Sequence, residues 1–171
     1  LCTPNSEIHA LDPDTGAKKW VFDPKAEMPP AGKCRGVAYF KAGENGAECD
    51  ERIVFGTVDA RLMAVDARTG KVCSGFGAAG TVDLRRGMGE IRKGYYFVTS
   101  APTIVNGNII VGGWVADNQY VGEPSGVIRA LDAVTGRLAW AWDMDNPDHR
   151  GEPADGKTYS LELCGGTHVG R

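Results

Sequence analysis

The sequence predicts an all-β fold that forms part of a β-propeller. A repeated phrase, paired runs of β-branched residues and the absence of a sustained helical period support this prediction. The phrase Ala-x-Asp-x-x-Thr-Gly occurs at residues 10–16, 64–70 and 130–136. Its Asp can bond the backbone two residues on and its Gly can adopt a positive φ, so each copy predicts a tight turn between strands. Repetition on this scale indicates stacked copies of one structural unit.

The first two copies belong to one partial and one nearly complete unit. Residues 8–22 predict two strands, the outer half of a four-stranded blade. A second blade is expected with strands at 37–40, 53–57 and 61–65 and a poor fourth strand at 71–76. Ser74 stands where the other copies have Trp20 and Trp140, whose rings can pack on a neighbouring repeat. Residues 77–96 are rich in Gly and Arg and are interpreted as a loop between blades.

The third unit is the clearest one. Its four strands are expected at 103–105, 109–111, 127–131 and 138–142, with a hairpin turn at 106–108. The chain thus holds about two and a half four-stranded antiparallel blades, whereas closed propellers have about four to eight. We therefore expect residues 1–157 to be a partial propeller cut from a larger one, and residues 158–171 to be an unrelated tail.

Composition limits the possible partners. The 24 Gly and 9 Pro among 171 residues fit a chain with many tight turns. A formal net charge of -3 argues against nucleic acid as a partner. Neither a signal peptide nor a run of apolar residues long enough to span a bilayer is visible. Membrane contact is thus expected only through segments outside this sequence.

Five cysteines are present, and none forms a Cys-x-x-Cys pair. Cys34 and Cys49 flank the loop 41–48 between two apolar runs. If those runs pair as a hairpin, the two sulfurs could meet, and a disulfide closing this loop would stabilise the fold by roughly 3 kcal/mol and indicate an oxidising compartment. The alternative is that both are free thiols, and both interpretations stay open.

Blades that end in Ala-x-Asp-x-x-Thr-Gly-x-x-x-Trp resemble the tryptophan-docking motif of the pyrroloquinoline quinone (PQQ) dehydrogenases. Three further stretches are similar to that family: 34–39 (Cys-Arg-Gly-Val-Ala-Tyr), 57–62 (Thr-Val-Asp-Ala-Arg-Leu) and the segment 98–113. The resemblance implies an eight-bladed periplasmic propeller and, most closely, the membrane-bound glucose, quinate and polyol branch.

The resemblance also implies a set of site residues. Arg35, Thr99 and Asn118 would contact PQQ, and Asp117 would ligate Ca²⁺ or Mg²⁺. Alternative roles are a surface charge for Arg35, an ordinary strand residue for Thr99 and an Asx turn for Asp117. Trp114 would either line the site or pack in a loop. The catalytic residues are unknown, because the family places them in later blades.

Two departures from the family pattern bear on the substrate. Cys34 lacks the neighbouring Cys of the alcohol dehydrogenases, and Phe40 stands where glucose enzymes carry His. The resemblance therefore implies oxidation of another polyol, quinate or shikimate first and glucose next, with electrons passed to ubiquinone. The parent would be periplasmic and anchored to the inner membrane. The alternative is a non-enzymatic propeller scaffold of the outer-membrane assembly type.

The tail carries a second resemblance. Residues 164–168, Cys-Gly-Gly-Thr-His, are similar to an element of the alanyl-tRNA synthetase editing domain. There the residues matching Cys164 and His168 supply half of a zinc site. Zinc needs four ligands, or three and a water, and the matching pair is missing here, so we expect no tight zinc binding. We expect an unnatural junction, such as a fusion, to account for the element. Chance similarity in a Gly-rich tail and a tRNA-editing or zinc-binding module are the alternatives.

Overall fold

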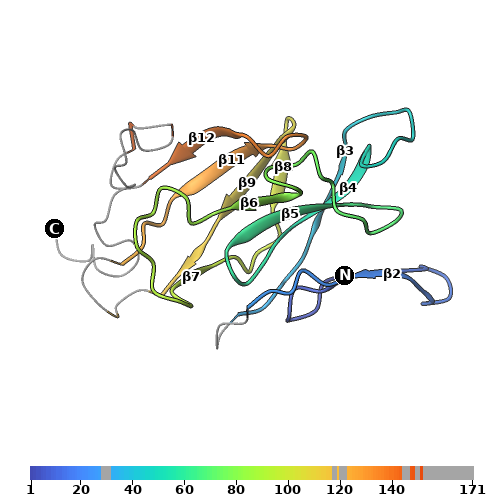
Figure 1. Ribbon diagram of the computed structural model, residues 1–171, viewed down its shortest axis with the longest axis horizontal. Coiled ribbons are helices and arrows are strands. Elements are labelled where there is room, and N and C mark those ends of the chain that lie inside the picture. The colour runs from blue at the N-terminus through green and yellow to red at the C-terminus, as the bar shows by residue number, and fades with distance from the viewer. Residues whose placement is uncertain (28–31, 117–118, 120–122, 144–146, 149–150, 152–171) are drawn as a thin grey trace.

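The protein is an all-β structure of side-by-side antiparallel sheets (Figure 1). The computed structural model describes residues 1–27, 32–116, 119, 123–143, 147–148 and 151, and each regular element within them is a strand. Two sheets have four strands and two have two strands. Within these residues, no helix has the length and apolar character needed to cross a bilayer. The predicted fold class is confirmed.

The first repeat forms a hairpin, as predicted. Strand β1 (Ile8–Leu11) pairs with β2 (Lys18–Phe22), and the register shifts after Ala10. The turn is closed by Asp12, whose Oδ1 accepts hydrogen bonds from the backbone N–H of Asp14 and from both the N–H and the hydroxyl of Thr15. The Asp and Thr of the repeated phrase are therefore joined by a local network that fixes the turn.

The second sheet runs in chain order: β3 (Ala38–Lys41), β4 (Glu51–Gly56), β5 (Arg61–Asp66) and β6 (Thr81–Asp83). Its fourth strand corrects the prediction of a strand at 71–76. Val72 makes only an isolated bridge with Val65, and the chain then leaves the sheet and returns at Thr81. The repeat position alone could not show this detour.

The third sheet contains β8 (Thr103–Val105), β9 (Asn108–Gly112), β11 (Ile128–Asp132) and β12 (Leu138–Trp142). All four strands were predicted. A small additional sheet pairs β7 (Tyr96–Phe97) with β10 (Trp114–Val115). Because β6 and the start of β7 lie between residues 77 and 96, the interpretation of that whole segment as a loop was wrong.

Aromatic rings join successive sheets by packing on the Gly of the next turn. A Cβ added at Gly70 would stand 2.6 Å from the Trp20 ring, and the Trp20 indole N–H donates to the Ala67 carbonyl over 3.1 Å. At the next boundary, a Cβ at Gly136 would lie 3.2 Å from the ring of Phe76, which is fully buried. Phe76 thus takes the packing role for which Ser74 is too small.

The main core lies between the second and third sheets. It includes Val54, Leu62 and Phe76 from the second unit and Ile109 and Leu131 from the third. Burial of this shared apolar surface holds the two sheets in a fixed relative position, because neither sheet can cover its own inner face alone.

The cysteine pairing corrects the sequence-based hypothesis. Cys34 bonds Cys2, and Cys49 bonds Cys73, so neither the Cys34–Cys49 pair nor the free thiols occur. Strands β3 and β4 do pair as a hairpin, but their register places Ala38 opposite Val54. Cys34 therefore lies beyond the end of the hairpin that is remote from Cys49, and each sulfur finds a partner in another segment.

Candidate functional site

Arg35 and Thr99, which are far apart in the chain, lie side by side. The backbone N–H of Arg35 donates to the carbonyl oxygen of Thr99 over 2.9 Å. Next to this bond, a Cβ added at Gly36 would stand 2.9 Å from the Cβ of Ala101, so the two segments approach too closely for a larger residue. Both residues precede the first strand of their sheet, which explains why the repeat brings them to the same end of neighbouring sheets.

The Arg35 side chain faces solvent, and Thr99 is half-buried. Within the described part of the chain, the Arg35 guanidinium forms no ion pair, so its charge remains available to an anion. A guanidinium presents a planar fork of donors that matches a carboxylate. The arrangement can therefore grip a flat, acidic molecule beside a hydroxyl group.

Trp114 provides an aromatic surface near the same segment. It pairs with Phe97 across β7 and β10, and the two ring centroids are 4.6 Å apart at an interplanar angle of 33°. Trp114 is nevertheless 44% exposed, and Phe97 lies only two residues before Thr99. One face of a large ring is thus held by packing while part of it stays open to solvent.

Asp117, the predicted metal ligand, and Asn118, a predicted PQQ contact, both lie outside the described residues. Among the residues that are described, no group of three or more His, Cys, Asp or Glu could hold a metal ion. Sequence reasoning missed two buried carboxylates, one before β11 and one after β12. Glu123 accepts a bond from the Gln119 N–H over 2.7 Å, and Asp143 accepts one from the Ser125 hydroxyl over 2.9 Å.

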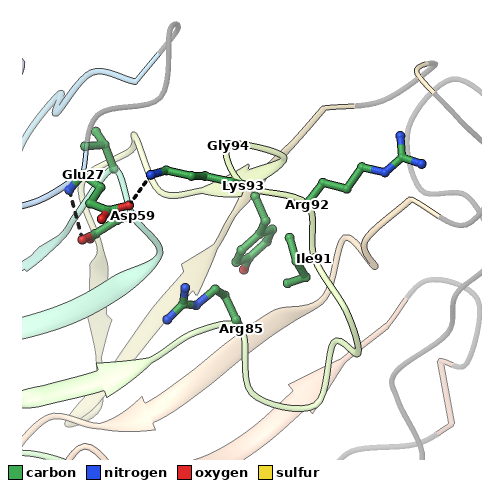
Figure 2. Close-up of a pocket in the computed structure, with 9 residues that line it drawn as sticks. Glu27, Asp59, Arg85, Ile91, Arg92, Lys93 and Gly94 are labelled. Carbon is green, nitrogen blue, oxygen red and sulfur yellow. Dashed lines mark hydrogen bonds and ion pairs between the residues drawn. The ribbon is translucent and has the colours of Figure 1, made fainter.

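A cavity of about 250 Å³ lies beside the β4–β5 turn and β7 (Figure 2). Its lining carries two carboxylates, Glu27 and Asp59, together with three basic side chains. Lys93 Nζ lies 2.7 Å from Glu27, and Arg61 binds Asp59 over 2.8 Å. Burial alone would raise the pKa of Asp59, but bonds from Arg61 and Thr57 outweigh it, and the pKa is lowered. Both carboxylates of the lining are thus paired with a cation, Glu27 with Lys93 of the same lining and Asp59 with Arg61 outside it.

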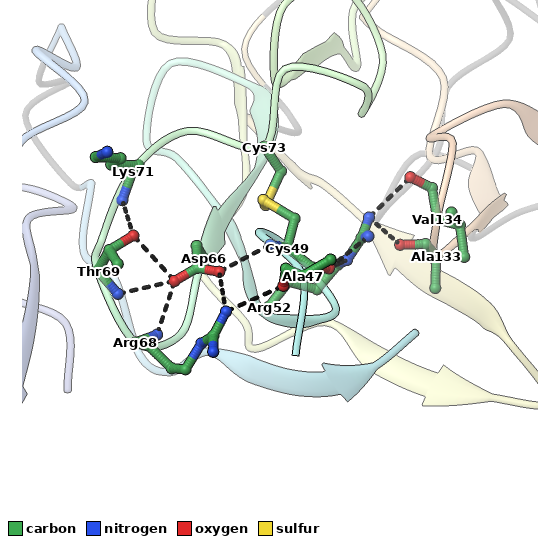
Figure 3. Close-up of a disulfide and its surroundings, with 10 residues drawn as sticks. All are labelled: Ala47, Cys49, Arg52, Asp66, Arg68, Thr69, Lys71, Cys73, Ala133 and Val134. Carbon is green, nitrogen blue, oxygen red and sulfur yellow. Dashed lines mark hydrogen bonds and ion pairs between the residues drawn. A yellow bond between two sulfur atoms is a disulfide. The ribbon is translucent and has the colours of Figure 1, made fainter. Parts of the chain in front are cut away.

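A second cluster that the sequence did not reveal surrounds the Cys49–Cys73 disulfide (Figure 3). The buried Arg52 donates to the carbonyl oxygens of Cys49, Ala133 and Val134, and it thereby links the second sheet to the third. Burial lowers the pKa of its guanidinium. The sequence signal for this role is weak: Arg52 stands beside Glu51 at the start of a strand that continues with Ile53, Val54 and Phe55.

The buried Asp66 completes the cluster. Its carboxylate accepts bonds from the N–H of Cys49, Arg68 and Thr69 and from the Thr69 hydroxyl. Burial raises its pKa, but these bonds outweigh the effect and the pKa is lowered. The turn carboxylate of the second repeat is thereby joined to the disulfide.

Phe40, the residue from which the substrate prediction was drawn, is half-buried and packs against the main core cluster. Its neighbour Tyr39 is 54% exposed, as the alternation of a strand requires. Because core packing accounts for Phe40, the position gives no structural support for a particular polyol, and the substrate stays a prediction.

Comparisons with known proteins agree with this architecture. The family described as "Glucose/ethanol/alcohol dehydrogenase, beta-propeller domain" matches residues 1–165. The glycerol dehydrogenase large subunit of Gluconobacter oxydans is 39% identical over 94% of this chain and 22% of its own length. The quinate/shikimate dehydrogenase (quinone) of Acinetobacter baylyi is 43% identical over 86% of this chain and 20% of its own length.

A solved structure shares the fold. The quinohemoprotein alcohol dehydrogenase of Comamonas testosteroni superposes with a TM-score of 0.62 at 27% identity, over 84% of this chain and 19% of that one. The chain spans about a fifth of the length of the curated relatives named above. On the evidence of the family match and the blade structure, the chain belongs to the β-propeller family of the PQQ-dependent dehydrogenases.

Proposed function

We propose that these residues form part of a PQQ-dependent dehydrogenase that oxidises a polyol, with quinate or shikimate as the first candidate and glucose as the next. The observation that carries the proposal is the pairing of Arg35 with Thr99 at the entrance to two neighbouring sheets. A scaffold propeller has no need for an exposed guanidinium at this point, beside a close approach of two backbones.

The residues fit the quinone by their chemistry. PQQ is a planar tricarboxylate, Arg35 offers a forked cation, Thr99 a hydroxyl and Trp114 a flat ring. In this proposal Arg35 binds a carboxylate, Thr99 positions the adjacent edge and Asn118 adds a further polar contact. When bound, the quinone accepts the two electrons, and the divalent cation acts as a Lewis acid.

Asp117 is proposed as a ligand of that cation, because carboxylate oxygens suit Ca²⁺ and Mg²⁺. The catalytic base is not assigned to any residue of this chain. The identity of 43% to the quinate/shikimate enzyme supports quinate or shikimate as the first candidate. Two disulfides support an oxidising compartment and hence a periplasmic location. Anchoring to the inner membrane and electron transfer to ubiquinone complete the proposal.

The test uses the full-length polypeptide, reconstituted with PQQ and Ca²⁺, and follows dye reduction with quinate, glycerol and glucose. We expect PQQ-dependent oxidation that is fastest with quinate. Arg35→Ala should weaken PQQ binding at least tenfold, about 1.4 kcal/mol. Lys33→Ala, which removes an exposed cation two residues away, should not. The absence of PQQ-dependent oxidation of any of these polyols would refute the proposal and favour the scaffold alternative.

The boundary between residues 157 and 158 also stays a proposal, because Cys164 and His168 lie outside the described residues. Metal analysis of the purified polypeptide tests the tail. We expect substoichiometric zinc, and one zinc per chain that is lost in Cys164→Ser would show that the tail is a metal site.

A further inference from the structure

We propose that the Cys2–Cys34 disulfide positions Arg35 for the cofactor, so that reduction of this one bond lowers the affinity for PQQ. This inference rests on the proposed function. Cys34 immediately precedes Arg35, and the disulfide links it to a residue 32 positions earlier, with the two Cα atoms 6.0 Å apart. The bond therefore fixes the backbone from which the guanidinium projects.

Cys2, at one end of the disulfide, belongs to a segment that is held by a β-bridge and by core packing. Cys2 forms a β-bridge with Ile8, which is 2% exposed, and packs against the smaller core cluster. Ser6, in the loop between them, is fully buried and accepts a hydrogen bond from the Val58 N–H of the second sheet over 3.3 Å. The disulfide thus connects Arg35 to a segment that is itself tied to two sheets.

The Arg35 end has no sheet of its own. Strand β3 begins at Ala38, so Arg35 and Gly36 lie before the ladder of β3 and β4. Their described links are the disulfide at Cys34, the bond from the Arg35 N–H to Thr99 and the contact of Gly36 with Ala101. Two of these links go to the segment 99–101 and the third goes to Cys2, so loss of the disulfide removes the only covalent link of the three.

Positioning of this kind acts through preorganisation. A side chain whose backbone is already fixed loses less conformational entropy when it binds a ligand, and this smaller entropy loss raises the affinity. One long side chain immobilised in advance corresponds to about a tenfold change in dissociation constant. Arg35 remains the contacting group, and Cys2 and Cys34 act through it as positioning residues.

The second disulfide supplies a matched control. Cys49–Cys73 spans 24 positions, a comparable loop, but it borders Arg52 and the third-sheet turn instead of Arg35. Removing either bond should destabilise the fold to a similar degree. Only removal of Cys2–Cys34 should change the grip of Arg35 on a ligand.

The experiment compares Cys2→Ser/Cys34→Ser with Cys49→Ser/Cys73→Ser in the full-length apoenzyme, titrated with PQQ and followed by tryptophan fluorescence. We expect the PQQ dissociation constant to rise about tenfold in the first variant and less than twofold in the second. In an Arg35→Lys background the first effect should shrink below twofold. Equal shifts in both variants, or an undiminished shift beside Arg35→Lys, would overturn the inference.

A measurement without cofactor separates this inference from the proposed function. Amide hydrogen exchange at Arg35 should accelerate at least tenfold in Cys2→Ser/Cys34→Ser and stay unchanged in the other variant. Unchanged exchange at Arg35 overturns the positioning role, whereas failure of the wild-type apoenzyme to bind PQQ overturns the function. If the variant does not fold, limited reduction of the folded protein replaces it, since Cys2 and Cys34 are half-buried whereas Cys73 is 2% exposed.

Discussion

Arg52 donates a hydrogen bond of 3.2 Å to the carbonyl oxygen of Ala133, across the boundary between the second and third sheets. Ala133 and Ala67 are equivalent positions in successive copies of the repeated phrase. At the earlier boundary, the carbonyl oxygen of Ala67 accepts a hydrogen bond from the indole N–H of Trp20. Phe76 fills the space of the missing indole but has no N–H. The ring and the donor of one tryptophan are therefore supplied here by two residues, Phe76 from the turn after Val72 and Arg52 from β4.

Replacing Arg52 should destabilise the protein strongly. Arg52→Met leaves the carbonyl oxygens of Ala133 and Cys49 without this donor in a buried setting, which should cost about 2–4 kcal/mol in the free energy of unfolding. Arg68→Met is the control, because Arg68 also donates to two carbonyls but its side chain is 50% exposed. The control should lose less than about 1 kcal/mol in denaturant unfolding. Equal losses would show that Arg52 is not a special link.

The packing of aromatic rings on turn glycines predicts that Gly→Ala substitutions at equivalent turns lower the stability by different amounts. Gly16, Gly70 and Gly136 share a φ near +71°, but a Cβ at Gly16 would meet no atom within 4 Å. Gly16→Ala should therefore cost only the backbone strain, about 1–2 kcal/mol. Gly70→Ala should cost at least about 1 kcal/mol more, since the new methyl group meets Trp20. Chemical denaturation measures the difference, and a Gly70→Ala loss no greater than that of Gly16→Ala would contradict tight docking.

The first turn predicts a pH effect with a defined sign. The pKa of Asp12 is lowered from 3.8 to about 2, first by Lys19 and then by the Thr15 N–H and hydroxyl. A carboxyl with a depressed folded-state pKa stabilises the fold above its unfolded pKa, and this contribution is lost as the pH falls from about 4 towards 2. Lys19→Met should raise the pKa of Asp12 towards 3.8, as read from carboxyl carbon shifts in labelled protein.

Lys18→Met is the matched control for that titration, because the adjacent Lys18 is exposed and makes no ion pair with Asp12. Its effect on the Asp12 pKa should be small. A shift as large as that of Lys19→Met would mean that general surface charge, and not the Lys19 contact, sets the pKa.

The two disulfides should contribute similarly to stability. On the chain-entropy estimate, loops of these lengths are each worth about 3–4 kcal/mol relative to the reduced chain. Cys49→Ser/Cys73→Ser and Cys2→Ser/Cys34→Ser should thus lower the unfolding free energy by comparable amounts. Thermal unfolding under non-reducing conditions measures this, and a loss confined to one pair would show that the other bond closes an already ordered loop.

Local patterns predicted most of the fold. The Asp-to-Gly phrase located the hairpins, and alternation and the Asn106–Asn108 turn located the third sheet, because these features depend on neighbouring residues only. The detour after Val72 was missed because it depends on where Phe76 packs, which is a property of the next sheet. The cysteine pairs were missed for the same reason, since they join segments that are paired only in the folded chain.

The candidate site was predictable in part. Arg35 and Thr99 occupy equivalent entry positions of neighbouring repeats, so the repeat itself implies their proximity. The role of Arg52 could not be predicted, because an Arg in a sequence is expected at the surface unless its buried carbonyl partners are known. Asp117 and Asn118 stay predictions, as no described residue tests them.

The division of one tryptophan into Phe76 and Arg52 has an evolutionary consequence. A single substitution that restores an indole at this boundary would compete with Phe76 for the same space against Gly136, and loss of the arginine alone would leave the Ala133 carbonyl without this donor. A change from the Phe76–Arg52 pair to a single tryptophan, or the reverse, therefore has to pass through a less stable intermediate sequence. Related chains should carry either both partners or neither, as a covarying pair.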